Sequence, residues 1–414
     1  MKINKKIVAL GLAMCSVSAS VLAGGYQLNE YSVAGLGRSY AGVGVVGDDY
    51  SAVAFNPAGM QLMDSGLQLG LTTVQLRADV KDESHTSAKN PGTIRLWPTM
   101  PHFFAQKRMD DRLNFGFGIY SPYGLATKYK RNWFASDVAV ESRLDIIDFA
   151  PAVSYKVVDG LTLGGTFIAR YIHGKMTNEI APGNGGGESN FSLDGWTVSG
   201  ILGAMYEFTP DTRVGFSWRL KSAQKVKGSH KIENNPVLSG IYKDSSASPD
   251  LPETFTLTAY HRLNKCYGLS GTARWTRWNH SFEKFVLKSS NPLVGDAVSP
   301  YKWKSSWTVT AGLDYYYDDN WTFRIGTGYD ESPSHDKYTR TVRIPDNDRI
   351  WASCGFSYKK GNWVFDVGYA HMFMKTTKVV EPRRPSMTVP NPDPVYAKYD
   401  TQSNIFGLQT QYRF

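Results

Sequence analysis

Long apolar runs are missing from this sequence, because no stretch offers 18 consecutive apolar residues. A helix needs about 20 such residues to cross a bilayer, so a helical membrane protein is excluded. Aromatic residues are instead plentiful, at 13% of the chain with 24 Tyr and 11 Trp. That content is high for a soluble protein and typical of a membrane β-barrel, which carries aromatic girdles at both membrane interfaces.

Cysteine is also scarce, with three residues in the whole chain. Cys15 lies in the leader described below, which leaves Cys266 and Cys354. An oxidising compartment would permit a bridge between them. Because one lies near an expected turn and the other in the middle of an expected strand, we expect two unpaired thiols.

Motifs for catalysis are absent as well. The eight histidines are scattered without the spacing of metal ligands, and no G-x-S-x-G nucleophile elbow occurs. Gly42, Gly44 and Gly47 match a dinucleotide fingerprint by letter, but no strand precedes them and the following acidic pair would repel a phosphate. We therefore expect no enzymatic activity, no metal and no cofactor.

The first residues read as a targeting segment. Lys2, Lys5 and Lys6 form a basic end, a short apolar core follows, and Ala23 closes a small-residue exit. This pattern predicts a secretory signal peptide at 1–23. Removing its three lysines lowers the net charge from +9 to about +6. In an exported chain this balance favours acidic outer membrane lipid or an anionic substrate over nucleic acid.

The rest of the chain alternates between apolar and polar residues over many short stretches. In 213–220, Val214, Phe216 and Trp218 share one face, and the residues between them are Arg, Gly or Ser. The stretches 307–317, 321–329 and 406–414 repeat the pattern, and the last ends in Phe414. In a membrane barrel the apolar face points to lipid and the polar face lines the lumen.

Loop lengths separate a barrel from a soluble sandwich. Six short turn signals lie near 110, 159, 210, 264, 318 and 360. Seven longer polar connections lie near 84–95, 125–140, 179–192, 232–250, 289–302, 332–345 and 381–400. Thirteen connections join fourteen strands, and short and long ones alternate strictly. The sequence therefore predicts an all-β fold, a 14-stranded antiparallel transmembrane β-barrel over 65–414, with both termini on the periplasmic side.

Residues 24–64 form a separate, glycine-rich segment ahead of this barrel. They hold eight glycines, and their apolar residues follow neither a helical nor a strand period for long. The lumen of a fourteen-strand barrel would leak unless it is filled. We therefore expect 24–64 to be an N-terminal hatch, a plug inside the lumen.

Several motifs resemble the FadL-type family of outer membrane transporters for long-chain fatty acids and other hydrophobic compounds. They are GYQLNEYSVAGLGRSYAG at 25–42, the acidic pair Asp48 and Asp49, the Asn56-Pro57-Ala58 turn, YGLAT at 123–127, YYYDDNWTFR at 315–324 and IPDNDRIWAS at 344–353. The resemblance spans the mature chain in order. It implies a plugged fourteen-strand barrel that passes hydrophobic molecules across the outer membrane of a Gram-negative bacterium without an energy source.

The resemblance also implies candidate ligand-binding residues. Lys304, which matches a basic residue of the family's pocket, falls on the lumen face by parity with Thr308 and Thr310. Arg170 also points inward by parity, and either cation would suit a fatty acid carboxylate. The family's other pocket arginine aligns near His173, which parity places outside. Tyr26, close to the free N-terminus, completes the candidates.

Two further groups concern gating. Gly24 and Gly25 form the expected N-terminus, and Asn56, Pro57 and Ala58 would fix the hatch against the wall; the alternative is a simple turn. The third strand carries Gly116, Gly118, Pro122 and Gly124. Glycine and proline mark interruptions in strands, and the resemblance implies a lateral opening there. An ordinary strand end is the alternative.

Three functions remain open at this point. The first is uptake of long-chain fatty acids through ligand-gated hatch movement. The second, on the same fold, is import of aromatic hydrocarbons or other small hydrophobic compounds. The third is a surface adhesin or structural barrel. The resemblance also implies an outer docking groove built from long, apolar loops. The connection at 179–192 is short and glycine-rich and the one at 232–250 is polar, so whether these loops form such a groove is an open question at this point. We expect a monomer whose partners are a hydrophobic small molecule, outer membrane lipid and lipopolysaccharide.

Overall fold

The computed structural model describes residues 24–84, 91–180, 186–291, 294–383 and 392–414. The expected signal peptide at 1–23 and Cys15 lie outside these residues. Cys266 and Cys354 are both free thiols, as expected, and both are exposed. No helix among the described residues is long and apolar enough to cross a membrane.

All strands within the described ranges belong to one antiparallel sheet of 21 segments. The sheet closes where its first and last strands pair, from Gly66 opposite Arg413 to Asp82 opposite Ala397. The segments are β1 Gly66–Asp82, β2 Gly92–Leu96, β3 Thr99–Arg108, β4 Leu113–Tyr120, β5 Gly124–Lys128, β6 Glu141–Val158, β7 Leu161–Glu179, β8 Glu188–Thr209, β9 Thr212–Arg219, β10 Val226–Glu233, β11 Gly240–Ala247, β12 Thr254–Arg262, β13 Tyr267–Thr276, β14 Lys284–Lys288, β15 Ala297–Pro300, β16 Ser306–Tyr316, β17 Trp321–Asp330, β18 Arg349–Lys360, β19 Trp363–Met374, β20 Thr377–Glu381 and β21 Val395–Arg413.

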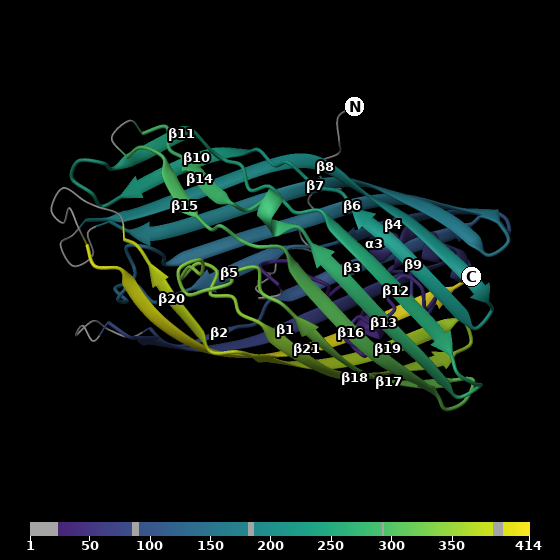
Figure 1. Cartoon of the computed structure of the whole chain (residues 1–414). Coiled ribbons are helices and arrows are strands. Elements are labelled where there is room, and N and C mark those ends of the chain that lie inside the picture. Colours follow the sequence, from purple (N-terminus) through teal and green to yellow (C-terminus); the bar gives the residue numbers. More distant parts are fainter. Residues whose placement is uncertain (1–23, 85–90, 181–185, 292–293, 384–391) are drawn as a thin grey trace.

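Seven spanning strands are interrupted once, so 21 segments make fourteen spanning strands in the described part of the chain. The interrupted strands are β2 with β3, β4 with β5, β9 with β10, β11 with β12, β13 with β14, β15 with β16, and β19 with β20. The prediction of a 14-stranded antiparallel barrel is confirmed. Figure 1 shows the long, tilted strands, with the C-terminus at the end that carries the short turns.

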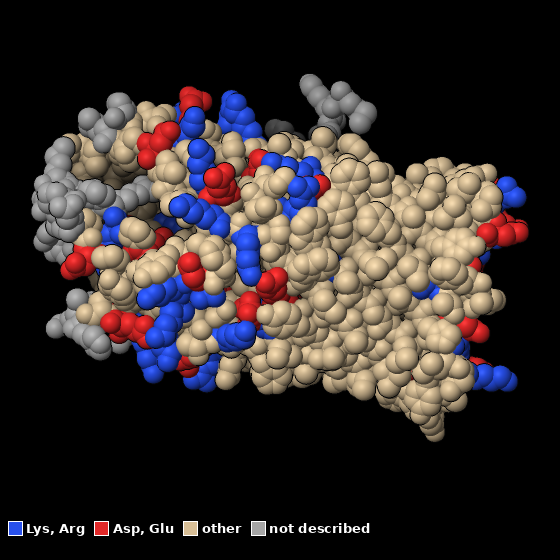
Figure 2. Space-filling view, in the orientation of Figure 1, with Lys and Arg blue, Asp and Glu red and all other residues tan. Residues whose placement is uncertain are grey.

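The two faces of the wall follow the alternation read from the sequence. Leu69, Phe406 and Leu408 are exposed on the outside, and their neighbours Gln68, Gln409 and Gln411 are buried inside. Phe414 is exposed, as expected for the lipid face. On the face that Figure 2 shows, a wide belt of the barrel has very few charged side chains and is bordered by Lys, Arg, Asp and Glu toward both ends. This belt matches the outward-facing apolar band of an outer membrane barrel.

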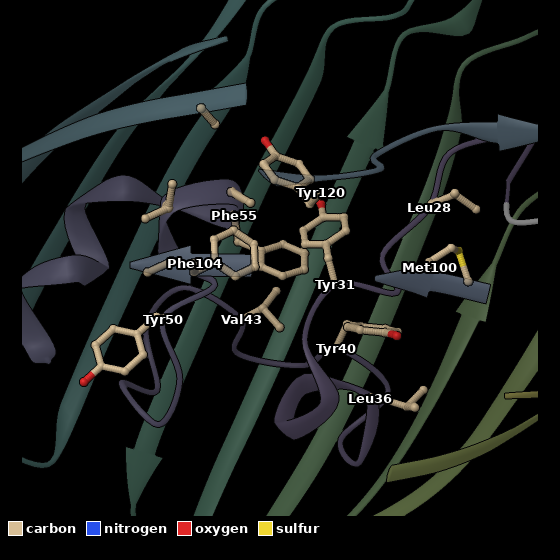
Figure 3. Packing of buried hydrophobic residues seen from close by; sticks show 14 of the residues in the cluster. Leu28, Tyr31, Leu36, Tyr40, Val43, Tyr50, Phe55, Met100, Phe104 and Tyr120 are labelled. Carbon is tan, nitrogen blue, oxygen red and sulfur yellow. The ribbon is translucent and has the colours of Figure 1, made fainter. Parts of the chain in front are cut away.

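Residues 24–64, here called the hatch segment, lie inside the barrel. They contain two short helices, α2 Val33–Leu36 and α3 Ala52–Phe55, and a 3-10 helix, η1 Pro57–Leu62; a second 3-10 helix, η2 Trp278–His280, lies in the wall. Ring packing joins the segment to the wall: Tyr31 stacks on Phe55 at 4.5 Å and lies 4.7 Å from Tyr120 of β4, as Figure 3 shows. Almost all of this segment is buried.

Candidate ligand-binding site and gate

The break in the third spanning strand is bound by the start of the hatch segment. β4 ends at Tyr120 and β5 begins at Gly124. Between them the Leu28 amide donates to the Pro122 carbonyl at 2.8 Å, and the Gly124 amide donates to the Tyr26 carbonyl at 3.0 Å. Gln27 and Tyr123 thus oppose each other in a short antiparallel bridge. The polar backbone groups at this break are satisfied by the hatch rather than by a neighbouring strand.

The wall has no continuous ladder at this break. β3 pairs with β4 from Phe103 to Arg108, whereas its Thr99–His102 part pairs with β1. β5 pairs with β6, and no pairing between β5 and β2 or β3 occurs in the described residues. Sheet hydrogen bonds therefore do not close the wall between β5 and the external part of the second spanning strand.

The N-terminal end of the hatch segment is held by two buried carboxylates. The Gly24 nitrogen donates to Asp330 Oδ2 and the Gly25 nitrogen to Asp346 Oδ2, each at 2.9 Å. Arg349 lies against both acids, at 3.1 Å from Asp330 and 2.9 Å from Asp346. Gly25 has a φ of 75°, and a Cβ there would approach the ring of Trp303 to 2.9 Å. A glycine is therefore required at position 25, where the start of the hatch segment is bound.

An apolar cavity lies directly beside Tyr26. It encloses about 630 Å³ of empty space, counting the part that opens to solvent. Tyr26 packs on Trp278 and Phe282, with ring centroids 5.0 and 5.4 Å away. The lining is almost entirely apolar and comes from many strands; it includes Leu125, Leu144, Ile172, Gly174, Met176, Phe191, Leu193, Val226, Phe285, Leu287, Tyr301 and Ile344, with Arg143 as its cation. Such a cavity suits a ligand with an extended hydrophobic surface.

The three expected cationic residues do not meet in this cavity. Lys304 is in a coil ahead of β16, its side chain is 45% exposed, and its ammonium pairs with Glu331 at 2.5 Å. Its expected orientation toward the lumen is therefore wrong. Buried Trp303 precedes Lys304 and buried Ser306 opens β16, so the alternation counted back from Thr308 is broken between Trp303 and Ser306. His173 lies outside, as parity predicts, and pairs with Asp194 at 2.8 Å.

Arg170 does point inward and is buried, but its guanidinium already forms an ion pair with a carboxylate of the chain. It donates two hydrogen bonds to Asp148, from Nε at 2.6 Å and Nη2 at 2.7 Å. Its carbon also lies 5.4 Å above the Tyr123 ring at the strand break. Arg143, at the cavity itself, pairs with Asp145 at 2.6 Å. Arg170 and Arg143 thus each already pair with a carboxylate of the chain.

The expected gate residues divide into two groups. Pro122 and Gly124 lie at the strand break and bond to the hatch segment. Gly116 and Gly118 lie in the paired part of β4 instead. A Cβ on Gly116 would meet Met60 at 2.6 Å and Val53 at 2.7 Å, and one on Gly118 would meet the Phe104 ring at 2.7 Å. These two glycines make room for hatch and luminal side chains.

The Asn56-Pro57-Ala58 turn rests against the inner wall. The Asn56 side chain donates to the Ala204 carbonyl at 3.1 Å and accepts from the Ala58 amide at 3.2 Å. Pro57 occupies the start of η1. A Cβ on Gly203 would lie 2.2 Å from the Asn56 oxygen. Because the wall strand has no side chain at that point, the turn can touch its backbone.

A charge cluster that the sequence analysis missed anchors the middle of the hatch segment. Buried Arg38 pairs with Asp48 at 2.6 Å and with Asp314 of β16 at 3.0 Å. Arg324 of β17 contacts the same two acids, at 3.0 and 3.2 Å. The sequence marked Asp48 only as part of an acidic pair. Its two cations lie 10 and 276 residues away, so local spacing gave no signal for the cluster.

Glu30 gives the hatch segment an expected pH dependence. It is buried, one of its oxygens has no hydrogen-bond partner within the described ranges, and burial raises its pKa to about 7 against the lowering effect of Arg349, with Asp330 adding to the increase. An acid with a raised folded pKa stabilises the folded state below its unfolded pKa near 4.5 and loses that contribution as pH rises toward 7. The full change corresponds to about 3 kcal/mol.

Raising the pH from about 5 to about 8 is therefore expected to loosen residues 24–36. Glu30 must then carry its negative charge while buried, with a hydrogen-bond partner for only one of its two oxygens in the described residues. Hydrogen exchange of the peptide covering these residues, read by mass spectrometry, is expected to show faster exchange at the higher pH after correction for intrinsic rates. Glu30→Gln is expected to reduce this pH dependence; burial also raises the pKa of Asp49, which accepts from the Ser32 hydroxyl, to about 6, and its share is expected to remain. An equal pH response in the variant would assign the effect to other groups.

Comparison with known proteins gives a consistent result along the whole chain. Residues 14–414 match the family model described as outer membrane protein transport protein (OMPP1/FadL/TodX). The chain is 28% identical over 417 residues to a long-chain fatty acid transport protein of Escherichia coli O6:H1, covering 90% of this chain and 92% of the relative. It is 24% identical over 483 residues to outer membrane protein P1 of Haemophilus influenzae, covering all of both chains.

Solved structures show the same fold. The crystal structure of a Pseudomonas aeruginosa FadL homologue superposes with a TM-score of 0.84 at 24% identity, over 94% of this chain and all of the other. The Pseudomonas putida toluene transporter TodX superposes with a TM-score of 0.68 at 16% identity, over 94% of this chain and all of the other.

Proposed function

Because this chain belongs to the OMPP1/FadL/TodX family of outer membrane transport proteins, we propose that it imports long-chain fatty acids or closely related acyl compounds by passive diffusion. The chain is an outer membrane β-barrel of a family of transporters for hydrophobic compounds. What is proposed is the ligand, the gate and the exit route. We also propose that a single chain is the functional unit, with residues 24–64 as its hatch.

The observation that carries the proposal is the double role of the N-terminal end of the hatch segment. The ring of Tyr26 lines the apolar cavity, and the backbone of Tyr26 and Leu28 bonds to the strand break. A ligand that displaces Tyr26 from the cavity therefore also pulls on the hydrogen bonds at the break. This coupling supports ligand-gated movement of the hatch.

The exit route follows from the ligand's own hydrophobicity. Each CH₂ group kept out of water contributes about 0.8 kcal/mol, so a long acyl chain is more stable in the bilayer than in the periplasm. The missing ladder between β5 and β2 or β3 in the described residues supports a sideways route, because no sheet hydrogen bonds would have to break there. We propose that the ligand leaves there, at Pro122 and Gly124, while the hatch segment keeps the axial path closed.

Fatty acids are favoured over smaller compounds by the relatives. The Escherichia coli O6:H1 relative, a long-chain fatty acid transport protein, is similar along nearly its whole length, and the FadL homologue superposes better than the toluene transporter. The cavity's extended lining also suits a long ligand, because it draws on β5, β6, β7, β8, β10, β11 and β14.

A second candidate ligand class is uncharged. It is favoured by one observation, that Arg170, Arg143 and Lys304 are each paired with a carboxylate of the chain. A fatty acid carboxylate would have to displace Asp148 to pair with Arg170, or Asp145 to pair with Arg143, whereas an ester, alcohol or aromatic hydrocarbon would not. Comparing binding of a fatty acid with its methyl ester separates the two classes.

The function is tested by uptake in cells that lack their own transporters. Cells expressing this chain are expected to take up labelled oleate faster than cells with the empty vector. The two kinds of cell are expected to take up labelled toluene at similar rates. Mass spectrometry of the purified barrel is expected to detect bound fatty acid. Faster uptake of toluene together with unchanged uptake of oleate would contradict the fatty acid proposal and support the second candidate.

Filling the cavity is expected to block uptake. Gly174 lies on the cavity wall, and a Cβ there would meet only one atom at 4.0 Å. In Gly174→Trp the indole would occupy the ligand's place, so binding of a fatty acid is expected to fall by roughly tenfold or more, measured by fluorescent-ligand titration.

Gly165→Trp is the matched control for this prediction. It lies on the same strand, β7, and a Cβ there has no atom within 4 Å. Parity places it on the outer face, where a tryptophan side chain would contact lipid and is tolerated. It is expected to bind like the unmodified protein. Equal loss in both variants would show that the effect comes from β7 rather than from the cavity.

A further inference from the structure

Cationic side chains form rows across the outside of four neighbouring spanning strands. Arg77 of β1 lies directly opposite Arg95 of β2. Four residues further along β1, on the same face, Lys81 lies opposite Lys398 of β21. Lys398 in turn lies opposite Lys378 of β20. Figure 2 shows Lys and Arg side chains gathered over this part of the barrel, where Figure 1 labels β2 and β20.

This arrangement is unfavourable for the protein alone. Like charges directly opposite each other on neighbouring strands destabilise a sheet, and here three such pairs share one surface. The side chains of Arg77 and Lys378 are 54% and 58% exposed, and Arg95 and Lys81 are also exposed. Burial against the protein therefore does not explain their placement, which indicates an anionic partner from outside.

The height of the rows identifies where that partner lies. On β1, Leu67 is opposite Tyr412, and Tyr412 is opposite Trp363, which mark the aromatic girdle at the short-turn end. Ten residues separate Leu67 from Arg77. At roughly 3.3 Å per residue and a strand tilt near 40°, Arg77 lies about 25 Å above that girdle. This equals the height of the apolar band, so the cations begin at the headgroups of the outer leaflet.

The acids within the surface fit the same partner. Asp79 and Asp400 lie directly opposite each other between the two cationic rows. Their contacts with Arg77 and Lys398 are long, at 3.5 and 3.8 Å, and Glu83 contacts Lys378 at 3.5 Å. Five cations against three acids leave a net charge of about +2. The acids separate the cationic rows without neutralising them.

We propose that this surface is a binding site for the phosphorylated headgroup of an outer-leaflet glycolipid. Arg77 and Arg95 would hold one phosphate, and Lys81, Lys398 and Lys378 would hold a second. Arginine suits bidentate contact with phosphate oxygens, and lysine supplies a compact charge. The site does not depend on the transported ligand, because its side chains point away from the lumen.

The test compares thermal unfolding of the purified full chain in detergent with and without diphosphorylated lipid A. The site variant carries Arg77→Ala, Arg95→Ala, Lys81→Ala and Lys398→Ala. The control variant carries Lys227→Ala, Lys231→Ala, Lys243→Ala and Lys288→Ala, which removes the same charge from β10, β11 and β14. No residue directly opposite those four in the described pairings is Lys or Arg.

Without lipid, the site variant is expected to unfold near the temperature of the unmodified protein, because the relief of repulsion between the cations is offset by leaving Asp79 opposite Asp400 without Arg77 and Lys398. Lipid A is expected to raise the unfolding temperature of the unmodified and control proteins by several degrees, and to leave the site variant unchanged. Dephosphorylated lipid A is expected to have no such effect. Should the site variant fail to fold, Lys81→Ala with Lys398→Ala is measured in the same way.

Three results would overturn the proposal. An equal lipid A response in the site and control variants would show that the cationic rows do not contribute to lipid A binding. An equal response to dephosphorylated lipid A would assign the effect to acyl chains on the apolar belt. No response of the unmodified protein would mean that the surface binds no such lipid.

Discussion

Deleting residues 24–64 is expected to turn a closed barrel into one that conducts ions. The inner wall is lined by polar and charged side chains, among them Gln68, Arg219, Asp314, Arg324 and Asp366, all buried against the hatch segment or each other. Without the hatch segment these groups would be hydrated, and a fourteen-strand lumen would hold a continuous water path. Single-channel recording in a planar bilayer is expected to show steady conductance for the deletion variant and a silent unmodified protein.

Folding of the deletion variant can be checked independently. Its strands bond mainly to each other along the wall, so circular dichroism is expected to keep its β signal and the barrel to remain heat-modifiable on gels. Arg324 and Asp314 keep each other as partners at 3.2 Å after Arg38 and Asp48 are removed. A folded deletion variant with no conductance would show that other segments close the lumen.

Locking the hatch segment to the strand break is expected to stop uptake. Gln27 and Tyr123 oppose each other, and the flanking bonds join Leu28 to Pro122 and Gly124 to Tyr26. They are therefore a non-hydrogen-bonded pair, whose Cα atoms lie about 4.5 Å apart, within the range of a disulfide. In Gln27→Cys with Tyr123→Cys, oxidation is expected to reduce oleate uptake to the level of cells without the transporter, since the start of the hatch could no longer leave the break.

The reduced form of this variant is its own control. Uptake is expected to return on adding a reductant, which separates the lock from the loss of the Tyr123 ring and its contact with Arg170. The exposed Cys266 and Cys354 are first replaced by serine so that no other disulfide forms. Undiminished uptake by a fully crosslinked population would show that the ligand passes without moving Gln27.

The wall of this barrel could be predicted from sequence because alternation is a local property. On β9, Gly215, Ser217 and Arg219 are buried and Phe216 is exposed, as the spacing of Val214, Phe216 and Trp218 predicts. Strand number followed from loop length, which is also read locally. Parity worked equally for Arg170, which lies on an uninterrupted strand.

Side-chain parity does not hold where a spanning strand is interrupted. Parity places Lys304 by counting back from Thr308, but β16 begins at Ser306, and the alternation is broken between buried Trp303 and buried Ser306. A count of residues cannot show a break whose reason is distant: here the Lys304 amide bonds to the Pro333 carbonyl, 29 residues away. Each break in a spanning strand therefore ends the range over which parity predicts orientation.

The partners of buried charges were beyond sequence analysis for a related reason. Arg170 was recognised as inward, but Asp148, its partner on the neighbouring strand, is 22 residues away, and register between strands is needed to find it. The bonds between Leu28 and Pro122 join segments with no common pattern. Residue type and spacing indicated the strand break, and only the fold shows that the hatch segment occupies it.

The contacts of the hatch segment also constrain the order of assembly. It is made before the barrel strands, yet the Val33 amide bonds to Gln409, 376 residues later, and the Asp48 carbonyl accepts from Arg413, 365 residues later. Closing such long loops costs entropy before any contact forms, and contacts of this kind make folding slow. The hatch segment therefore cannot reach its final structure until β21 has been exported, and a chain truncated before β21 would present it unfolded to periplasmic proteases.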